Sequence, residues 1–375
     1  MAVPAESYLS FIVPATLALW LGLHLPLKLR AEGKSADTRR VGLTRREKKG
    51  MDILIAFGFF VQAISSHLPP QLNFLYCMLG LLRFVGALAL MFTSTRGWQW
   101  RVGVVYLGLL IHASSEGLFY EFVLWCGYLF ISFAYLKRWR WKLLFFLAIS
   151  FLVLTILNGV KQEYRQRIVA EEISNTEKVT TLGTLMWDSL GKGNDPYSIK
   201  EERGLGDKLV RWNQGWIIAR IMSTVPDIQP YAKGETILSA IVASIVPRVC
   251  LPGKLGASSK ETFERFTGLR ISQSTSMALG VAGEMYANFG RIGGILSTFV
   301  YGLLIGFIFS KFNRLAEKDI LWWAWAPFVL LPCIEAEWNL VDVLNHITKS
   351  SIVMIGLIYL IPVFRTRLLS RRIRN

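Results

Sequence analysis

The sequence predicts an all-α polytopic membrane protein with about nine transmembrane helices, an outer amino terminus, an inner carboxyl terminus and a large outer loop with interfacial helices. Three observations lead to this prediction. The chain of 375 residues is 53% hydrophobic and contains 13 Trp, which is too apolar for an average soluble domain. Its apolar stretches have the length of membrane spans. The segments that connect them alternate between rich and poor in Lys and Arg.

Crossing about 30 Å of hydrocarbon takes roughly 17 to 25 helical residues. The stretches that approach this length cover residues 8–27, 51–68, 71–95, 102–115, 117–136, 143–160, 291–312, 320–338 and 349–364, and the fourth and fifth fit least well. No Lys or Arg precedes the first stretch, so we expect a retained helix there rather than a cleaved signal peptide. The spans divide the chain into a six-helix region (1–160), a large outer loop (161–290) and a three-helix region with a basic cytoplasmic tail (291–375).

The positions of the cations predict the topology. More than half of the 42 Lys and Arg residues lie in five segments, 28–49, 96–101, 137–142, 311–318 and 365–374. Turns with almost no cation alternate with them, at 69–70, 114–117 and 339–346. Because short cytoplasmic loops collect Lys and Arg, the five basic segments are predicted to be inside. This use accounts for the formal charge of +16 without a nucleic-acid partner.

The outer loop is predicted to contain two helices. Residues 217–225 and 236–246 are apolar at helical spacing, and they are followed by Pro226 and Pro247. We interpret both as helices that lie in the membrane interface or re-enter the membrane.

Five cations of this loop are candidates for binding a phosphate group. Lys161 and Arg165 lie one turn apart after the sixth span, where they either meet a phosphate or form an interfacial charge cluster. Arg248 lies at the end of an apolar helix with Lys254 shortly after it, and its fork of donors suits pyrophosphate oxygens. The alternative for Arg248 is an ion pair with an acid of the same loop. Arg211 follows the same logic with less constraint.

Acidic and aromatic candidates form two groups. Glu284, between Gly283 and Gly290, could act as a general base, bind sugar hydroxyls, or pair with Arg291 or Arg248. In the second group Glu335 follows an apolar run, where burial can make a carboxylate a useful base. Its neighbours are solvated turn residues by default, although Trp338 could stack on a sugar and His346 could accept a proton. These neighbours are Glu337, Trp338, Asn339, Asp342, Asn345 and His346.

Several other chemistries find no support in the sequence. The chain has no HExxH, DxD, GxSxG or GxxxxGK[ST] motif, and its four cysteines lie far apart. We therefore expect no metal, no cofactor and no disulfide framework.

Arg83 lies in the middle of the third span. It either forms a buried pair that orients helices or holds a lipid phosphate.

Four short motifs resemble those of the Wzy-type O-antigen and exopolysaccharide repeat-unit polymerases. The resemblance covers about residues 161–312, and its most specific part is the last of the four motifs. They are Arg211-Trp212-Asn213-Gln214, Tyr231 with Gly234-Glu235-Thr236, Pro247-Arg248 with Pro252 and Lys254, and Gly283-Glu284-Met285-Tyr286-Ala287-Asn288-Phe289-Gly290.

The resemblance implies a metal-independent, membrane-embedded glycosyltransferase of the bacterial cytoplasmic membrane. At the outer face, such an enzyme moves a growing glycan from undecaprenyl pyrophosphate onto a lipid-linked repeat unit. Its other implied partners are membrane lipid, a chain-length regulator and a flippase of the same pathway.

The resemblance also implies roles for individual residues. Arg211, Arg248 and Lys254 would hold the pyrophosphate, whose charge must be stabilised without a metal. Glu284 would orient or deprotonate the acceptor hydroxyl. The remaining candidates for substrate binding are Lys161, Arg165, Tyr286, Asn288, Glu335 and His346.

Three alternatives stay open on the sequence. A transporter or flippase for lipid-linked oligosaccharide would place charges throughout its spans, whereas the polar residues here gather on one side. An O-antigen ligase would use the same grip on pyrophosphate. A non-catalytic partner of a synthase complex would tolerate the loss of Arg248.

Overall fold

Helices make up most of the residues that the computed structural model of the protein describes, with turns and irregular segments between them. The described residues are 2–31, 42–67, 69, 72–116, 119–137, 164, 180–181, 183–185, 187, 215–246, 260–272, 277–335 and 337–369. They contain helices and no strand, which confirms the predicted all-α class. Within the described ranges, four helices are long and apolar enough to cross a membrane, namely Ala5–Leu27, Asn73–Phe92, Val281–Lys318 and Leu340–Leu360. These helices are consistent with a multi-pass membrane protein.

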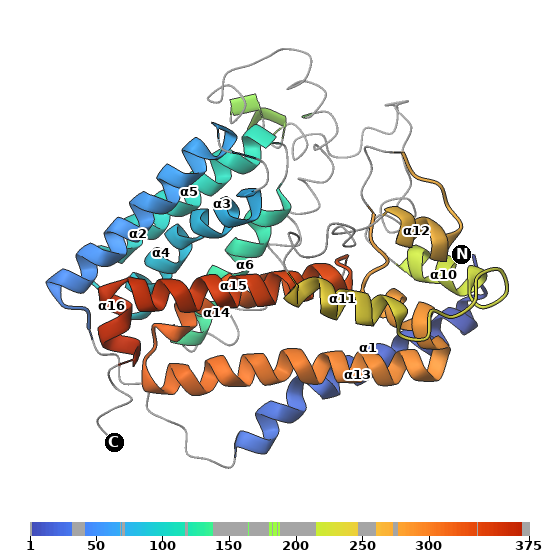
Figure 1. Ribbon diagram of the computed structural model, residues 1–375. Helices are drawn as coiled ribbons and strands as arrows, with labels where there is room; N and C mark the ends of the chain where they lie inside the picture. Colours follow the sequence, from blue (N-terminus) through green and yellow to red (C-terminus); the bar gives the residue numbers. More distant parts are fainter. Residues whose placement is uncertain are drawn as a thin grey trace. The chain divides into compact units, whose positions relative to one another are not determined.

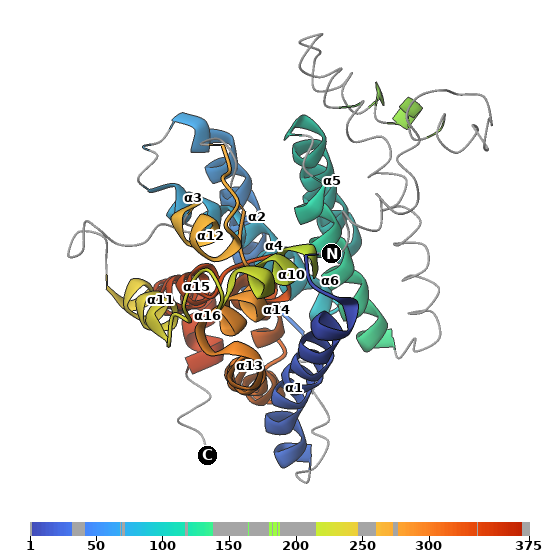
Figure 2. The same cartoon turned by 90° about the vertical axis from the view of Figure 1, so that its right-hand side faces the viewer.

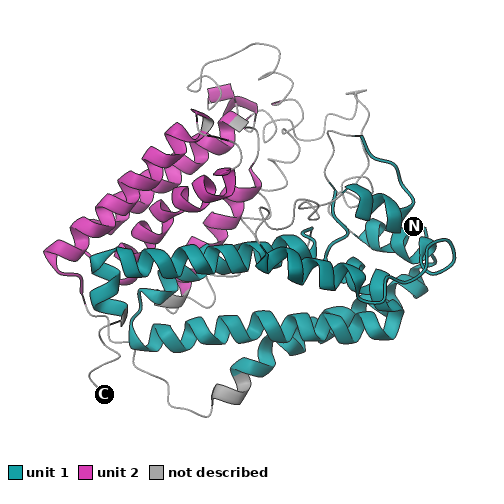
Figure 3. Ribbon diagram, viewed as in Figure 1, with its two compact units in different colours: residues 1–39, 203–375 teal, residues 40–202 magenta. Residues whose placement is uncertain are grey.

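The count of nine spans remains a prediction. Tyr120–Ala134 and Trp322–Ile334 are apolar helices of 10 to 17 residues, shorter than a full crossing. The predicted span at 143–160 lies outside the described residues. The chain divides into two compact units, one of residues 1–39 and 203–375 and the other of residues 40–202 (Figure 3).

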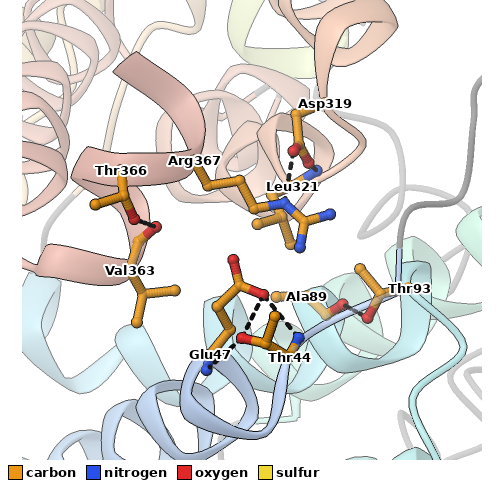
Figure 4. A network of polar contacts seen from close by, with 9 residues as sticks. All are labelled: Thr44, Glu47, Ala89, Thr93, Asp319, Leu321, Val363, Thr366 and Arg367. Carbon is orange, nitrogen blue, oxygen red and sulfur yellow. Dashed lines mark hydrogen bonds and ion pairs between the residues drawn. The ribbon is translucent and has the colours of Figure 1, made fainter. Parts of the chain in front are cut away.

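The unit of residues 40–202 contains α2 (Arg45–Ile64), η1 (Ser65–His67), α3 (Asn73–Gly80), α4 (Leu82–Phe92), α5 (Trp98–Glu116) and α6 (Tyr120–Lys137). Helix α2 starts with a capping box, because Thr44 and Glu47 each accept the backbone N–H of the other (Figure 4). Glycines let α2 and α4 approach closely. A Cβ on Gly58 would lie 2.7 Å from the Arg83 nitrogen, and one on Gly86 would lie 2.8 Å from the Met51 carbonyl.

Arg83 is buried between these two helices. Its Nη1 donates to the side-chain oxygen of Gln62 on α2. Its guanidinium lies 5.5 Å from the ring centre of Phe59 and 4.8 Å from that of Phe84. The contact joins α4 to α2, as expected of a buried arginine that orients helices. A second tie, the bidentate pair between Arg101 and Asp52, joins α5 to α2.

The other unit contains the long helices α1 (Ala5–Ala31), α13 (Val281–Lys318) and α15 (Leu340–Leu360). Its shorter helices are α10 (Gly215–Thr224), α11 (Glu235–Ile245), α12 (Lys260–Thr267), α14 (Trp322–Leu330) and α16 (Pro362–Phe364), with η3 (Leu331–Ile334) and η4 (Arg365–Leu369). Helices α10 and α11 match the two helices predicted in the outer loop.

Helices α1 and α13 lie against each other (Figures 1 and 2), and a seam of glycines lines their contact. A Cβ on Gly22 would lie 2.5 Å from the carbonyl oxygen of Phe299. A Cβ on Gly302 would lie 2.7 Å from the Leu19 oxygen, and one on Gly306 would lie 2.6 Å from the Leu23 oxygen. Small residues of this kind let membrane helices pack backbone to backbone.

Helix α13 is kinked at Gly290. This residue has φ 69° and ψ −159°, a backbone conformation that residues with a Cβ rarely adopt. A Cβ there would also lie 2.8 Å from the Tyr231 hydroxyl. The predicted seventh span, 291–312, therefore corresponds to the part of α13 that follows the kink.

Two sequence predictions in this unit need correction. The turn predicted at 339–346 is wrong, because α15 begins at Leu340 and residues 340–346 form its first turns. The apolar positions 340, 341, 343 and 344 give these turns one apolar helical face. The eighth span, 320–338, is interrupted, since α14 ends at Leu330 and a 3₁₀ turn that contains Pro332 follows.

A buried ion pair lies just after the end of α13, between Asp319 and Arg367. Asp319, which follows α13, accepts from the Arg367 Nε at 2.6 Å and from the Leu321 backbone at 3.0 Å (Figure 4). Both charged side chains are buried. Because the partners neutralise each other, the carboxyl-terminal helical turn is held to the α13–α14 connection.

Candidate functional site

The described part of the four sequence motifs centres on Glu284, in the first turn of α13. Its side chain is only 4% exposed. Its Oε2 accepts the backbone N–H of Leu340, the first residue of α15, at 2.9 Å. Amides at a helix start lack a partner within the helix, so a carboxylate from another helix here acts as the cap of α15.

The cap is reciprocal. Asn339 occupies the N-cap position of α15, but its side chain makes no capping bond to that helix. Its Oδ1 instead accepts the N–H of Leu279, just before α13, at 2.8 Å. The starts of α13 and α15 thus each receive a hydrogen-bond acceptor from the other. This exchange fixes the two helices relative to each other at the end where the motif lies.

Asn288, one turn after Glu284, connects α13 to α11. Its Nδ2 donates to the Thr236 hydroxyl at 2.7 Å and to the Glu284 carbonyl at 2.8 Å, and its Oδ1 accepts the Gly234 N–H at 2.9 Å. The amide is 1% exposed, and both its donors and its oxygen are used. Thr236 is also hydrogen-bonded to the Glu284 carboxylate, so one polar network joins α11, α13 and α15.

The kink at Gly290 explains why the chain before α11 docks at this point. In a continuous helix the carbonyls of Ala287 and Asn288 would accept the N–H groups four residues later. Here, just before the kink, they accept from the backbone of Ala232 and Lys233, each at 3.0 Å. The carbonyls released by the kink therefore fix the segment that leads into α11.

Tyr286 and Arg291 contact α1 rather than Glu284. The Tyr286 ring meets Phe11 edge-on at 4.9 Å, and its hydroxyl is hydrogen-bonded to Tyr231. The Arg291 Nε donates to the Ser10 carbonyl at 3.2 Å. Of the partners considered for Glu284 from the sequence, Arg291 therefore has another contact, while the Glu284 carboxylate is bonded to Leu340 and Thr236.

The second predicted group surrounds the start of α15. The His346 Nε2 donates to the Phe328 carbonyl of α14 at 3.1 Å, because a carbonyl can only accept. The His346 ring lies 6.2 Å from the Trp338 ring and is buried, whereas Glu335 is half-buried. Asp342 lies close enough to Glu284 for their charges to interact. This group and the Glu284 network thus share the first turns of α15.

Half of the predicted site residues can be placed. Glu284 and Asn288 share one network, Glu335 and His346 flank the start of α15, and Tyr286 faces α1. The other five, Lys161, Arg165, Arg211, Arg248 and Lys254, lie outside the described residues. In the described ranges, no three His, Cys, Asp or Glu side chains gather as metal ligands would.

Sequence reasoning missed two members of the network. Thr236 was part of a motif but was given no role, and Asn339 was assigned to a solvated turn. Asn339 did carry a usable signal, since an asparagine directly before the apolar pair of Leu340 and Val341 is typical of a helix start. No local signal indicates Thr236, because its partner Asn288 lies 52 residues away.

An ion pair next to Thr236 gives a pH prediction. Arg265 of α12 donates two hydrogen bonds to Glu235, at 2.8 and 3.0 Å, and these bonds lower the pKa of Glu235. Stabilisation from a lowered pKa is present above the unfolded value of about 4.3 and is lost as the pH falls through the folded value. Glu235→Gln should therefore lower the melting temperature at pH 7, and this deficit should shrink at an acid pH below the unfolded value, where Glu235 takes up a proton. Because the pair is exposed, we expect it to contribute less than about 1 kcal/mol to the free energy of unfolding at pH 7.

Thermal unfolding of detergent-purified protein at both pH values tests this expectation. Glu261→Gln, at an exposed glutamate on α12, is the matched control and should show no pH-dependent difference from the wild type. A Glu235→Gln deficit that stays the same at low pH would contradict the assignment.

Comparisons of the chain with protein-family models, curated proteins and solved structures find no match. The resemblance to repeat-unit polymerases therefore remains a prediction that depends on the motif residues and their chemistry.

Proposed function

We propose that the protein is a polysaccharide repeat-unit polymerase of the bacterial cytoplasmic membrane, with its site on the outer side. The observation that most supports this proposal is the buried network of Glu284, Asn288 and Thr236. It lies at the start of a membrane-length helix and consists of residues from the motifs that resemble the polymerase family. Burying a carboxylate beside an apolar span is costly, so such groups usually serve a function.

The proposed reaction is a glycosyl transfer. The hydroxyl oxygen of the acceptor repeat unit attacks the anomeric carbon of the growing glycan. The bond from that carbon to the pyrophosphate oxygen breaks, and undecaprenyl pyrophosphate leaves with the electron pair. The hydroxyl proton passes to a base. In this proposal Arg211, Arg248 and Lys254 stabilise the charge that develops on the leaving group.

The geometry favours different roles for the candidate acids. One Glu284 oxygen is bonded to the Leu340 amide and the side chain is buried, so we assign Glu284 to positioning the three helices around the acceptor. His346 is also buried, and its Nε2 is bonded to Phe328. Glu335 is half-buried and lies just before the turn where α15 starts, so we assign it to accepting the proton.

The proposal predicts that Arg248→Ala abolishes long glycan chains. Without the guanidinium, the leaving pyrophosphate loses a charge-assisted contact, and the loss of one such group typically lowers turnover by about 100-fold or more. The test is glycan length on gels of cell-envelope extracts from a deletion strain complemented with each variant. Membrane levels of each variant are measured in parallel.

Arg314→Ala is the matched control, because Arg314 is an exposed arginine near the carboxyl-terminal end of α13, whereas Glu284 lies at its start. It should restore long chains. Long chains from Arg248→Ala would contradict the proposal. Lipid-linked units that accumulate on the cytoplasmic face of the deletion strain would indicate a transporter. Long chains that stay on the lipid carrier in the deletion strain would indicate a ligase.

A further inference from the structure

Helix α11 is apolar but too short to cross a membrane. It covers Glu235–Ile245, and residues 236–246 include no charged side chain. Eleven residues at about 1.5 Å each give a helix of about 16 Å, which is half of the ~30 Å hydrocarbon layer. The length thus fits a helix that enters one leaflet.

The two faces of α11 differ in size rather than in polarity. One face consists of the small residues Thr236, Ala240, Ala243 and Ser244, all buried. The other face carries large apolar side chains at positions i, i+3, i+4 and i+7. These residues are Leu238, Ile241, Val242 and Ile245, which are 64%, 43%, 38% and 68% exposed. A water-facing helix surface would be polar at these positions.

The small-residue face packs on membrane-length helices. Ala240 and Ala243 belong to one buried cluster with Met285 of α13 and with Leu340 and Val343 of α15. Helix α11 lies beside α15 in Figure 2. Small residues that contact large ones in this way are typical of helix packing inside membranes.

The exposed face of α11 resembles the outer surfaces of its neighbours. On α13, Ile292 is 75% and Leu296 is 61% exposed. On α15, Ile352 is 66% and Ile355 is 52% exposed. Both helices have the length and composition of membrane spans. If lipid hydrocarbon covers the exposed apolar residues of α13 and α15, it can also cover the exposed apolar face of α11.

We propose that α11 is a half-membrane helix and that phospholipid acyl chains cover its face of Leu238, Ile241, Val242 and Ile245. Within α11 the charged side chain is Glu235 at its start, which pairs with Arg265, and Lys233 precedes the helix, while Arg248 follows the last helical residue by three positions. This end lies at the headgroups, and Ile245 lies deepest. The inference does not rest on the polymerase proposal, since a membrane protein of another activity would give the same result.

The test measures bilayer depth at single sites. Nitroxide labels are attached to Leu238→Cys, Ile241→Cys and Ile245→Cys in a chain whose four native cysteines are replaced by serine or alanine. The protein is placed in nanodiscs of phosphatidylcholine and phosphatidylglycerol without isoprenoid lipid. Collision with oxygen, which concentrates in hydrocarbon, is compared with collision with a water-soluble nickel chelate.

We expect a severalfold excess of oxygen over nickel accessibility that increases from Leu238→Cys to Ile245→Cys. Ile228→Cys, at a 79% exposed residue in the turn before α11, should instead be accessible to nickel. Ala240→Cys, at a buried position, should be protected from both reagents. Nickel accessibility at Ile245→Cys equal to that at Ile228→Cys would overturn the proposal. Protection from both reagents along the whole face would also overturn it, because protein would then cover that face.

A second measurement leaves the native cysteines in place. Ile241→Trp is compared with the wild type in vesicles whose lipids carry bromine on their acyl chains. Bromine quenches a nearby tryptophan, so the added fluorescence should be quenched strongly. If the extra fluorescence of Ile241→Trp over the wild type is not quenched, the inference is contradicted. Because all native cysteines are present, cysteine replacement cannot explain such a result.

Discussion

Replacing Glu284 with alanine is expected to destabilise the protein and to abolish long glycan chains together. The change removes the carboxylate that accepts the backbone N–H of Leu340. Leu340 is buried, so this N–H loses its hydrogen-bond partner inside the protein. An unsatisfied buried donor costs about 1 to 3 kcal/mol, and the cavity left by the side chain adds to this cost. Because the same carboxylate is bonded to Thr236, the contact between α11 and α13 is weakened as well.

Glu284→Gln separates positioning from chemistry. Glutamine keeps an amide oxygen that can accept the Leu340 N–H, but it cannot take up a proton at neutral pH. If Glu284 positions the helices, as we propose, this variant should stay close to the wild type in melting temperature and should retain substantial polymerisation. Thermal unfolding in detergent and glycan length in a complemented deletion strain give the two readouts. A stable Glu284→Gln protein that leaves single repeat units would show that the carboxylate takes part in the reaction.

Replacing Gly302 with leucine is expected to disrupt the packing of α1 on α13. The first side-chain carbon would lie 2.7 Å from the Leu19 carbonyl and 3.2 Å from the Gly22 Cα. Both are backbone atoms that cannot rotate away, so the helices must separate along their length. Overpacking usually costs about 1 to 3 kcal/mol, and we expect at least the upper value where one helix backbone meets another.

Gly356→Leu is the matched control for this change. Gly356 also lies inside a membrane-length helix, α15, and a Cβ there would meet no atom within 4 Å. Both substitutions replace a helical glycine with the same strong helix former, so the difference between them reports packing alone. The measurement is the yield of monodisperse protein after detergent extraction, together with its melting temperature. Equal behaviour of the two variants would contradict the glycine seam.

The helices could be predicted where one local pattern determined them. Residues 217–225 and 236–246 were found from apolar spacing and a following proline, and the structure has α10 and α11 there. The start of α15 was missed because Asp342, Asn345 and His346 make its first turns look like a polar loop. Their helical state depends on an apolar face and on a cap that another helix supplies.

The sequence indicated some residues of the candidate site, but it did not indicate the contacts between them. The sequence singles out Glu284 as a carboxylate between glycines, and it leaves open whether Glu284 acts as a general base, binds sugar hydroxyls or pairs with Arg291 or Arg248. In the structure the partner is a backbone amide 56 residues away, and no side-chain pattern can indicate it. The kink at Gly290 is a similar case, since its glycine is visible in the sequence but the docking of Ala232 and Lys233 on the released carbonyls is not.

The glycine seam also determines the order in which the chain can assemble during synthesis. Helix α1 leaves the ribosome before its partner α13, because Arg291, near the start of α13, follows Ser10 by 281 residues. At about 5 to 20 residues per second, this separation is a delay on the order of tens of seconds. For that time the face of α1 that carries Gly22 lacks α13, the helix on which it packs in the structure. Amino-terminal fragments that end before α13 should therefore present this face to insertion factors or to other nascent helices, and quality control should recognise them as unassembled.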